Sequence, residues 1–253
     1  MDPAGHRADD VDVTLLTVAS AEAVYRRLGV ILRRDLFGPP QIEALRAACD
    51  ALVESMGAGR IDARRVGHRP NLSGGSTFER LDPVCDLSAS FQRVAEDPQI
   101  LAQVAALIGG HPFLFKDKLI FKLSGDRGYG IHQDAPYYGL HADQLERVAT
   151  VVVAIDPIAP ASGGLQFTLD RHHERQPGLV GEARDVDPAS VADAPRWDAE
   201  APAGSVIVFH SLTPHGSGPN RSGGPRRLLY LSFVSDELKE LRDVYYRARW
   251  STP

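Results

Sequence analysis

Lysine is scarce in this chain of 253 residues, because only four of its 28 basic residues are lysines. Such a preference for arginine, together with many alanines and glycines, is typical of proteins encoded by GC-rich bacterial genomes. Cysteine is also scarce, since Cys49 and Cys85 are the only two and form no Cys-x-x-Cys pair. This usage argues against a disulfide-stabilised secreted protein and favours a cytoplasmic location.

Three further absences exclude whole classes of function. No apolar run approaches the roughly 20 residues that a membrane-spanning helix needs. Residues 1–10 are polar and acidic, and therefore do not resemble a secretory signal peptide. The net charge is −5 and the isoelectric point about 6.0, so no basic excess indicates a nucleic-acid partner. The expected partner is a small molecule, and nothing in the sequence specifies an oligomeric state.

The first half of the chain is predicted to be mainly helical. Residues 28–32 are an apolar run that predicts a strand, and Pro39-Pro40 then begins a pattern with helical spacing up to residue 53. Residues 57–80 are rich in Gly, Ser, Arg and Asn, which predicts a long loop. Residues 91–108 predict more helix, interrupted at Pro98 and ended by Gly109-Gly110.

After residue 110 the pattern changes to short strands separated by Gly and Pro. Residues 113–123 alternate, so that one face carries Lys116, Lys118, Ile120 and Lys122 and the other carries apolar side chains. Further strands are predicted at residues 148–156, 164–169, 204–210 and 227–235.

Helices followed by many short strands predict a mostly β fold with flanking helices around a jelly-roll, cupin-like core. We expect a single domain over residues 1–253. Its parts would be an N-terminal arm at 1–20, a helical flank at 25–110 and the jelly-roll core at 111–235. Residues 171–203 form a long acidic connection, which is either a lid over the site or a surface insertion with helix of its own.

Two short segments far apart in the sequence carry the chemistry. His132 and Asp134 are two residues apart, so on a strand both side chains point to the same face, and His215 follows in a Gly/Pro/Ser turn. Two histidines and one carboxylate on one face of a metal leave other positions open, the arrangement of non-heme Fe(II) oxygenases. The alternative is two structural histidines and a capping aspartate.

The surrounding motifs resemble the phytanoyl-CoA dioxygenase family over roughly residues 25–235. The resemblance implies a double-stranded β-helix core that uses Fe(II), 2-oxoglutarate and O2, with His132, Asp134 and His215 as the metal ligands. The motifs that carry it occur in the family's order: His132-Gln133-Asp134, Gly163-Gly164-Leu165-Gln166-Phe167, residues 204–210, His215-Gly216-Ser217-Gly218-Pro219-Asn220-Arg221 and Arg226-Arg227.

The resemblance also implies a site for 2-oxoglutarate. Arginine suits the distal carboxylate because its planar guanidinium can pair with two oxygens and stays charged. The family's arginine falls on Arg226, whose neighbour Arg227 should point the opposite way, and Ser217 is similar to a position that contacts the same carboxylate. Thr150 is expected to line the pocket, and Lys118 is the lysine of its strand that we expect to bind a carboxylate; solvated lysines are the alternative.

Substrate contacts are expected from Gln133, between the ligands, and from Tyr137 and Tyr138 directly after them. A basic loop at residues 64–69 either reaches an anionic or polar substrate or, more commonly for such loops, is solvated.

The resulting hypothesis is an Fe(II)/2-oxoglutarate-dependent dioxygenase that oxidises a C–H bond of a small molecule by hydroxylation, oxidative cyclisation, desaturation or epimerisation. Composition and family breadth favour a tailoring step in natural-product biosynthesis, such as that of an antibiotic. Two alternatives remain: a metal-dependent isomerase or hydrolase on the same barrel, and a non-catalytic 2-oxoglutarate-binding module.

Overall fold

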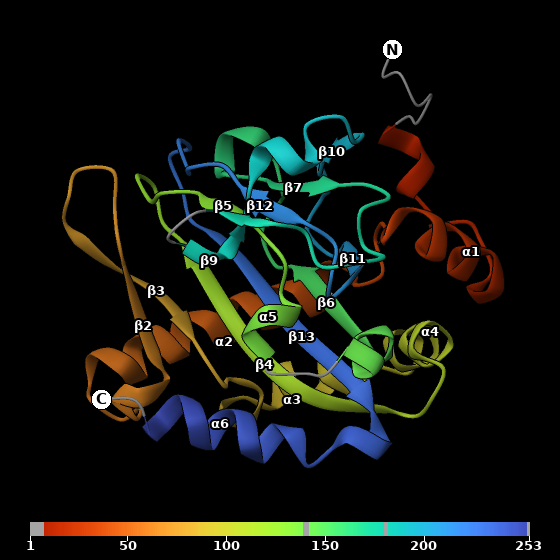
Figure 1. The fold of residues 1–253 in the computed structure, drawn as a ribbon. Coiled ribbons are helices and arrows are strands. Elements are labelled where there is room, and N and C mark those ends of the chain that lie inside the picture. Colours follow the sequence, from red (N-terminus) through yellow and green to blue (C-terminus); the bar gives the residue numbers. More distant parts are fainter. Residues whose placement is uncertain (1–7, 139–141, 180–181, 252–253) are drawn as a thin grey trace.

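Two antiparallel β-sheets face each other in the computed structural model, which describes residues 8–138, 142–179 and 182–251 (Figure 1). The larger sheet contains, in spatial order, β1 (Val30–Arg33), β11 (Val206–His210), β6 (Val148–Ala154), β13 (Arg226–Ser235), β4 (Pro112–Lys122), β3 (Ser76–Leu81) and β2 (Val66–Pro70). The smaller sheet contains β10 (Arg196–Asp198), β7 (Leu165–Thr168), β12 (His215–Ser217), β5 (Tyr129–His132), β9 (Glu182–Val186) and β8 (Gly178–Leu179).

Apolar side chains from the two facing sheets form one core. Phe167 and Trp197 of the smaller sheet stack with ring centroids 5.4 Å apart, and Phe167 also meets Phe209 of the larger sheet. Alternation along the strands of the larger sheet directs the next residues outward, where helices cover them, whereas outward residues of the smaller sheet such as Gln166 are exposed. This arrangement confirms the predicted fold class, a mostly β double-stranded β-helix with flanking helices.

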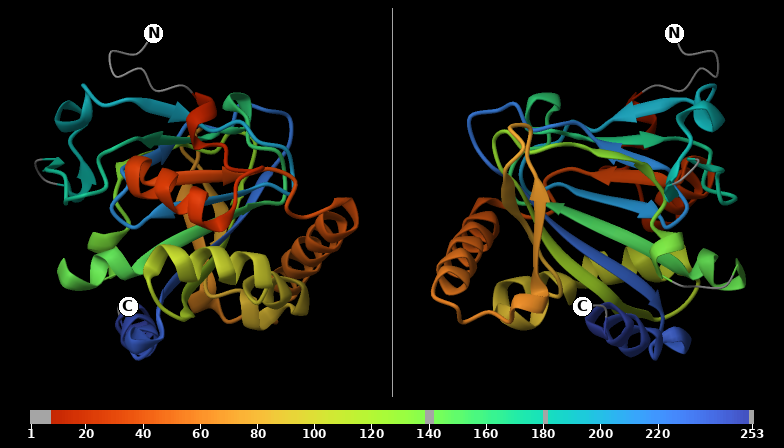
Figure 2. Two further views of the ribbon diagram at one scale, coloured as in Figure 1. Left: turned by 90° about the vertical axis from the view of Figure 1, so that its right-hand side faces the viewer. Right: turned by 60° about the vertical axis from the view of Figure 1, so that its left-hand side comes forward.

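Helices cover the outer face of the larger sheet (Figures 1 and 2). None in the described part of the chain is long and apolar enough to cross a membrane. The helices are α1 (Val18–Leu28), α2 (Pro39–Gly57), α3 (Ala89–Ala95), α4 (Pro98–Ile108), α5 (Ala135–Tyr138) and α6 (Leu241–Ser251).

Local sequence explains where α4 begins and ends. The Asp97 side chain accepts hydrogen bonds from two backbone N–H groups of the first turn, and Pro98 occupies the first helical position, where it loses no hydrogen bond. Gly109 ends the helix in the left-handed region at φ 66°, which costs glycine little. The predicted interruption at Pro98 and the stop at Gly109 are therefore confirmed.

Several predicted element boundaries are wrong. Residues 57–80 are not one loop, because β2 and β3 form a hairpin there that extends the larger sheet. Leu28 ends α1 and the strand begins at Val30, since Gly29 adopts φ 79° between them. Residues 171–203 contain three short strands and a 3-10 turn, Pro188–Val191. Helix α1 begins inside the expected arm, whose residues 1–7 lie outside the described residues.

The pairing of β4 with β13 places the polar residues that matter for the site. Lys122 lies opposite Arg226, Lys118 opposite Tyr230, and Lys116 opposite Ser232. These residues alternate with apolar ones that face the helices, so they point between the two sheets. The predicted lysine face is confirmed and lies inside the barrel.

Candidate metal centre

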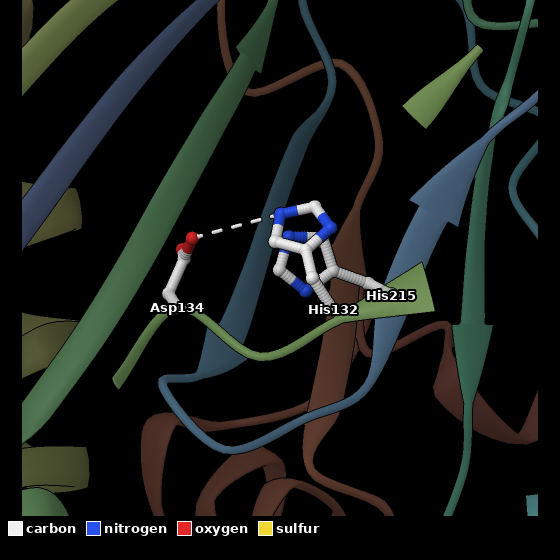
Figure 3. Close-up of side chains that lie close together, drawn as sticks. All are labelled: His132, Asp134 and His215. Carbon is white, nitrogen blue, oxygen red and sulfur yellow. Dashed lines mark ion pairs between the residues drawn. The ribbon is translucent and has the colours of Figure 1, made fainter. Parts of the chain in front are cut away.

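His132, Asp134 and His215 come together at the mouth of the barrel, as Figure 3 shows. One potential ligand atom from each lies within 4.8 Å of the others. His132 and His215 are paired residues on β5 and β12, with ring centroids 4.3 Å apart. Asp134 follows the end of β5, and its Oδ1 lies 3.9 Å from His132 Nε2. The spacing that predicted a shared direction for these side chains therefore brings three donors to one point.

Backbone carbonyls orient both imidazoles. His132 Nδ1 lies 2.9 Å from the Gly130 carbonyl oxygen, and His215 Nδ1 lies 3.0 Å from that of Thr213. Nδ1 must carry the proton to donate to a carbonyl, which leaves each Nε2 with a free lone pair. This outer hydrogen bond is the usual way in which proteins fix the tautomer and direction of a metal-binding histidine.

The local charges also favour ligation. Burial lowers the pKa of His215 to about 4, and His132 adds to this effect, so His215 is neutral at pH 7. Burial alone would raise the pKa of Asp134, but the fields of His215, Lys118 and His132 outweigh it and hold that pKa below its usual range. Neutral imidazoles and an ionised carboxylate are the forms that bind a divalent metal.

The residues expected to hold 2-oxoglutarate lie behind the triad. A narrow cavity connects with both histidines, and Arg226 lies beside one of its lining residues, Tyr230. Arg226 is 1% exposed, yet its Nε and Nη1 find no hydrogen-bond partner among the described residues. A buried guanidinium without partners is costly unless an anion joins it. The cavity is lined by Lys118, Ile120, Tyr129, His132, Leu165, His215, Gly216, Ser217 and Tyr230.

Lys122, rather than Lys118, contacts Ser217. Its Nζ donates to Ser217 Oγ at 2.6 Å and to the Gly218 carbonyl at 2.7 Å. Burial lowers the pKa of Lys122 to about 6, and the neighbouring Arg226 contributes. Lys118 lies instead with its Nζ 4.8 Å from the centre of the Tyr230 ring, between the narrow cavity and the wider one in front of it.

Three predicted contact residues do not reach these cavities. The Gln133 amide donates to the carbonyls of Glu174 and Leu212 and accepts from the Gln176 N–H, so it is used in holding the loops together. Thr150 and Tyr138 are buried, and both hydroxyls lie 3.0 Å from the same oxygen, Ser232 Oγ. The linings of the two cavities therefore lend no support to these three expected contacts, which stay predictions.

Tyr137 does line the cavity in front of the triad, as predicted. Of the basic loop, Arg69 also lines it, whereas Arg64 and Arg65 pair with Asp62 and Asp86. The sequence analysis missed several lining residues, since Arg80 lies in an expected loop and α6 was not predicted. Those missed residues are Arg80, Asp82, Asp185, Tyr245 and Arg249.

A comparison with protein families supports the same reading of the site. The profile of the phytanoyl-CoA dioxygenase (PhyH) family matches residues 25–228, which include the triad and Arg226. The chain belongs to the phytanoyl-CoA dioxygenase family. The predicted family, the class of non-heme Fe(II)/2-oxoglutarate-dependent oxygenase, and the predicted Fe(II) and 2-oxoglutarate are thereby confirmed.

Relatives and solved structures agree with the family. The chain is 30% identical over 188 residues to a methylphosphonate hydroxylase of Gimesia maris, covering 73% of this chain and 69% of that protein. It spans 55% to 65% of the length of three other curated relatives.

The structure of EctD from S. alaskensis with 2-oxoglutarate and 5-hydroxyectoine matches with a TM-score of 0.74 at 20% identity, covering 87% of this chain and 76% of EctD. The epimerase SnoN from nogalamycin biosynthesis matches with 0.71 at 19%, covering 86% and 83%.

Two further histidines of this protein, His172 and His210, are buried away from the triad, and their ring centroids lie 5.4 Å apart. Burial lowers the pKa of each to about 4. In the unfolded chain the two imidazoles take up a proton near pH 6.5, the ordinary pKa of histidine. In the folded chain they do so only near pH 4. We expect the free energy of unfolding to fall as the pH decreases through this window, by up to about 1.4 kcal/mol per pH unit for each histidine.

Urea unfolding of the metal-free protein at pH 7.5 and at pH 5.5 measures this effect. The His172→Asn variant should show a smaller difference between the two pH values than the unchanged protein. An equal difference in both proteins would contradict the assignment to His172. His111, which is exposed and does not contribute to the lowered pKa of His172 or His210, provides a matched control in His111→Asn.

Proposed function

We propose that this protein is an Fe(II)/2-oxoglutarate-dependent dioxygenase that oxidises a C–H bond of a small molecule. In this proposal His132, Asp134 and His215 hold the iron, and Arg226 with Ser217 holds the distal carboxylate of 2-oxoglutarate. The observation that carries it is a three-donor cluster together with the buried guanidinium of Arg226, which contacts Tyr230 of the narrow cavity but whose Nε and Nη1 lack hydrogen-bond partners among the described residues.

The residues divide the work between binding and orientation. Bound Fe(II) and 2-oxoglutarate would supply, with O2, the oxidising power that C–H cleavage needs. The three donors of the triad would hold the iron from one side and leave room for the cosubstrate and O2. Ser217 Oγ accepts a hydrogen bond from Lys122, the residue opposite Arg226 on the paired strand, so Ser217 and Arg226 would contact the same carboxylate. Apolar residues such as Leu165 line the same cavity and limit the entry of water.

The alternatives explain less of this arrangement. A metal-dependent isomerase or hydrolase needs the triad but has no use for a buried arginine with two unsatisfied guanidinium nitrogens. A non-catalytic 2-oxoglutarate-binding module needs the arginine but has no use for a second, wider cavity in front of the metal ligands. An oxygenase uses all three features.

The wider cavity supports a small metabolite as substrate. Its volume is about 330 Å³, near the lower end of the range for small-molecule sites. We place the reaction among the tailoring steps of natural-product biosynthesis, a setting shared with SnoN, whose fold is similar. Feeding candidate metabolites and following 2-oxoglutarate consumption tests this part, and consumption by none of them would contradict it.

An anaerobic titration tests the cofactor chemistry. Protein loaded with Fe(II) is titrated with 2-oxoglutarate while the visible spectrum is recorded. We expect the weak charge-transfer band of an iron–2-oxoglutarate chelate to appear and to saturate. Its absence from folded, iron-loaded protein would overturn the proposal and favour the isomerase or hydrolase alternative.

A further inference from the structure

The cavity in front of the triad is rich in positive charge. It opens beside His132 and Asp134 and has a volume of about 330 Å³. Three separate parts of the chain supply its basic and aromatic lining: the β2–β3 hairpin, strand β4 and helix α6. The residues are Arg69, Arg80, Lys116, Lys118, Tyr245 and Arg249.

The lysines of this cavity have no carboxylate partner. Among the ion pairs of the described residues, none includes Lys116 or Lys118. Lys116 is 8% exposed, and its Nζ lies 5.0 Å from the centre of the Tyr245 ring. Burial lowers its pKa, whereas Asp82 and Asp134 favour the charged form. Aromatic faces replace only part of the hydration that a buried ammonium loses, so an anion in the cavity would stabilise it.

The arginines of the hairpin are only partly neutralised. Arg80 Nη1 lies 2.5 Å from a Glu79 carboxylate oxygen, and Arg69 Nη1 lies 3.6 Å from the other oxygen of the same carboxylate. Two guanidinium groups therefore share one negative charge. Arg69 also stacks over the Tyr129 ring at 3.7 Å, which fixes its position at the cavity wall.

Arg249 adds a cation from a segment that the family profile does not cover. Its Nη2 lies 3.4 Å from Asp82, which also accepts a hydrogen bond from the Tyr246 hydroxyl at 3.1 Å. Arg249 Nε is buried and has no hydrogen-bond partner among the described residues. The match to the family profile ends at residue 228, so α6 lies outside the matched region.

Helix α6 is firmly attached, so Arg249 is held in place before any ligand arrives. Figure 1 shows the helix crossing the end of the larger sheet beside β4. Arg242 donates to the carbonyls of Leu114 and Phe115 and pairs with the buried Asp117. Near the other end of the helix, Arg64 lies 4.9 Å from the centre of the Trp250 ring. Preorganised charges of this kind bind an anion without a further ordering cost.

We propose that this cavity binds a substrate with a tetrahedral, doubly negative head group, a phosphonate or a phosphate monoester, held by Lys116, Arg80 and Arg249. Lys116 has no carboxylate of its own, and the two arginines Arg69 and Arg80 share the single charge of Glu79, so two positive charges are left to match a dianion, whereas a planar carboxylate with a single charge would leave one of them unpaired. The proposal rests on the proposed function. Binding of the head group would place a C–H bond of the substrate near the metal held by His132, Asp134 and His215. The head group would occupy the side of the cavity away from Arg226, so that 2-oxoglutarate keeps its own arginine.

Calorimetric titration with four small probes tests the proposal. The probes are ethylphosphonate, methyl phosphate, ethanesulfonate and propionate, added anaerobically to protein saturated with Fe(II) and 2-oxoglutarate. At least one of the two dianions should bind ten-fold or more tightly than both monoanions. If only one dianion binds tightly, its identity shows whether the head group is a phosphonate or a phosphate ester. Equal binding of a monoanion would overturn the proposal.

Variants connect the binding to this cavity. Lys116→Met should weaken binding of the preferred dianion ten-fold or more and breaks no ion pair, so we expect the variant to fold. Arg249→Met removes the partner of Asp82, and Arg249→Lys is therefore measured with it and should restore part of the affinity. Arg247→Met is the matched control, because Arg247 lies on the same helix with its side chain exposed. This variant should bind the preferred dianion as tightly as the unchanged protein does. Dianion binding that Lys116→Met leaves unchanged would overturn the proposal.

Failure of this inference is distinguishable from failure of the proposed function. The chelate band reports iron and 2-oxoglutarate binding without any substrate. A normal band with no dianion binding would reject the head group and leave the oxygenase in place. The same probes are titrated into metal-free protein, so that dianion binding sensitive to Lys116→Met is detected even if the chelate does not form.

Discussion

Asp134→Ala is expected to abolish Fe(II)-dependent consumption of 2-oxoglutarate. Loss of an outer hydrogen-bond partner of a metal ligand typically costs about 10–100-fold in metal affinity or activity, so loss of a ligand itself should cost more than about 100-fold. Asp134 is the one carboxylate of the triad and the group whose charge balances the metal. The chelate band and the rate of succinate formation, measured at saturating 2-oxoglutarate, both report the effect.

Two comparisons separate ligation from folding. His132→Ala and His215→Ala should produce the same loss, since all three donors lie within 4.8 Å of one another. Asp193→Ala is the control, because Asp193 is an exposed aspartate whose ion pair among the described residues is the one with Arg171 at the surface. Retention of more than a tenth of the activity in Asp134→Ala, with an intact chelate band, would show that the triad does not hold the iron.

Much of the site followed from strand periodicity alone. A period of two placed His132 and Asp134 on one side of the strand, and their donors meet there. The expected substrate contact of Gln133 did not follow from that period, which puts Gln133 on the opposite side, and its amide is bound to backbone groups instead. The same period placed Lys116, Lys118 and Lys122 inside the barrel. Periodicity is reliable here because one face of each strand is buried against the other sheet, which leaves a single register possible.

Other parts of the site could not be derived from local pattern. Strands β2 and β3 are mostly polar, β2 is the edge strand of the sheet, and the turn between them contains Gly74 and Gly75, so the composition of the whole hairpin resembles that of a loop. Helix α6 has little apolar surface, with Tyr246 as its buried residue, and charged contacts such as that between Arg242 and Asp117 attach it. Such long-range polar contacts leave no signature in a short window of sequence.

The choice between the lysines also depended on tertiary detail. Lys118 and Lys122 lie on the same face, and the sequence analysis favoured Lys118 for the carboxylate of 2-oxoglutarate. The pairing of β4 with β13 places Lys122 opposite Arg226, and the Gly163 turn lets Lys122 reach Ser217. A Cβ on Gly163 would lie 2.8 Å from Lys122 Cδ, so this glycine is needed for the close approach. Both lysines stay in the proposed site, with Lys122 behind the cosubstrate and Lys118 between the two cavities.

Arg226→Met is expected to weaken 2-oxoglutarate binding strongly while leaving the iron site intact. Removing one partner of a buried, hydrogen-bonded charge pair costs about 2–5 kcal/mol, which corresponds to a loss of affinity of about 30-fold or more. Without ligand, the guanidinium has two buried N–H groups that lack partners. The variant should therefore unfold at no lower urea concentration than the unchanged protein, because methionine removes an uncompensated charge from the interior. Titration of the chelate band gives the affinity, and urea unfolding gives the stability.

Arg227→Met is the control that makes the test specific to one face of β13. Arg227 points outward, where it pairs with Asp156 at 2.7 Å and with Asp50 at 3.1 Å. Its replacement should lower the free energy of unfolding and leave the affinity for 2-oxoglutarate unchanged, the opposite of the result expected for Arg226. Unchanged affinity in Arg226→Met would show that the distal carboxylate binds elsewhere, and Lys118→Met and Lys122→Met would then locate it, because Lys118 lines the narrow cavity and Lys122 contacts Ser217 of its lining.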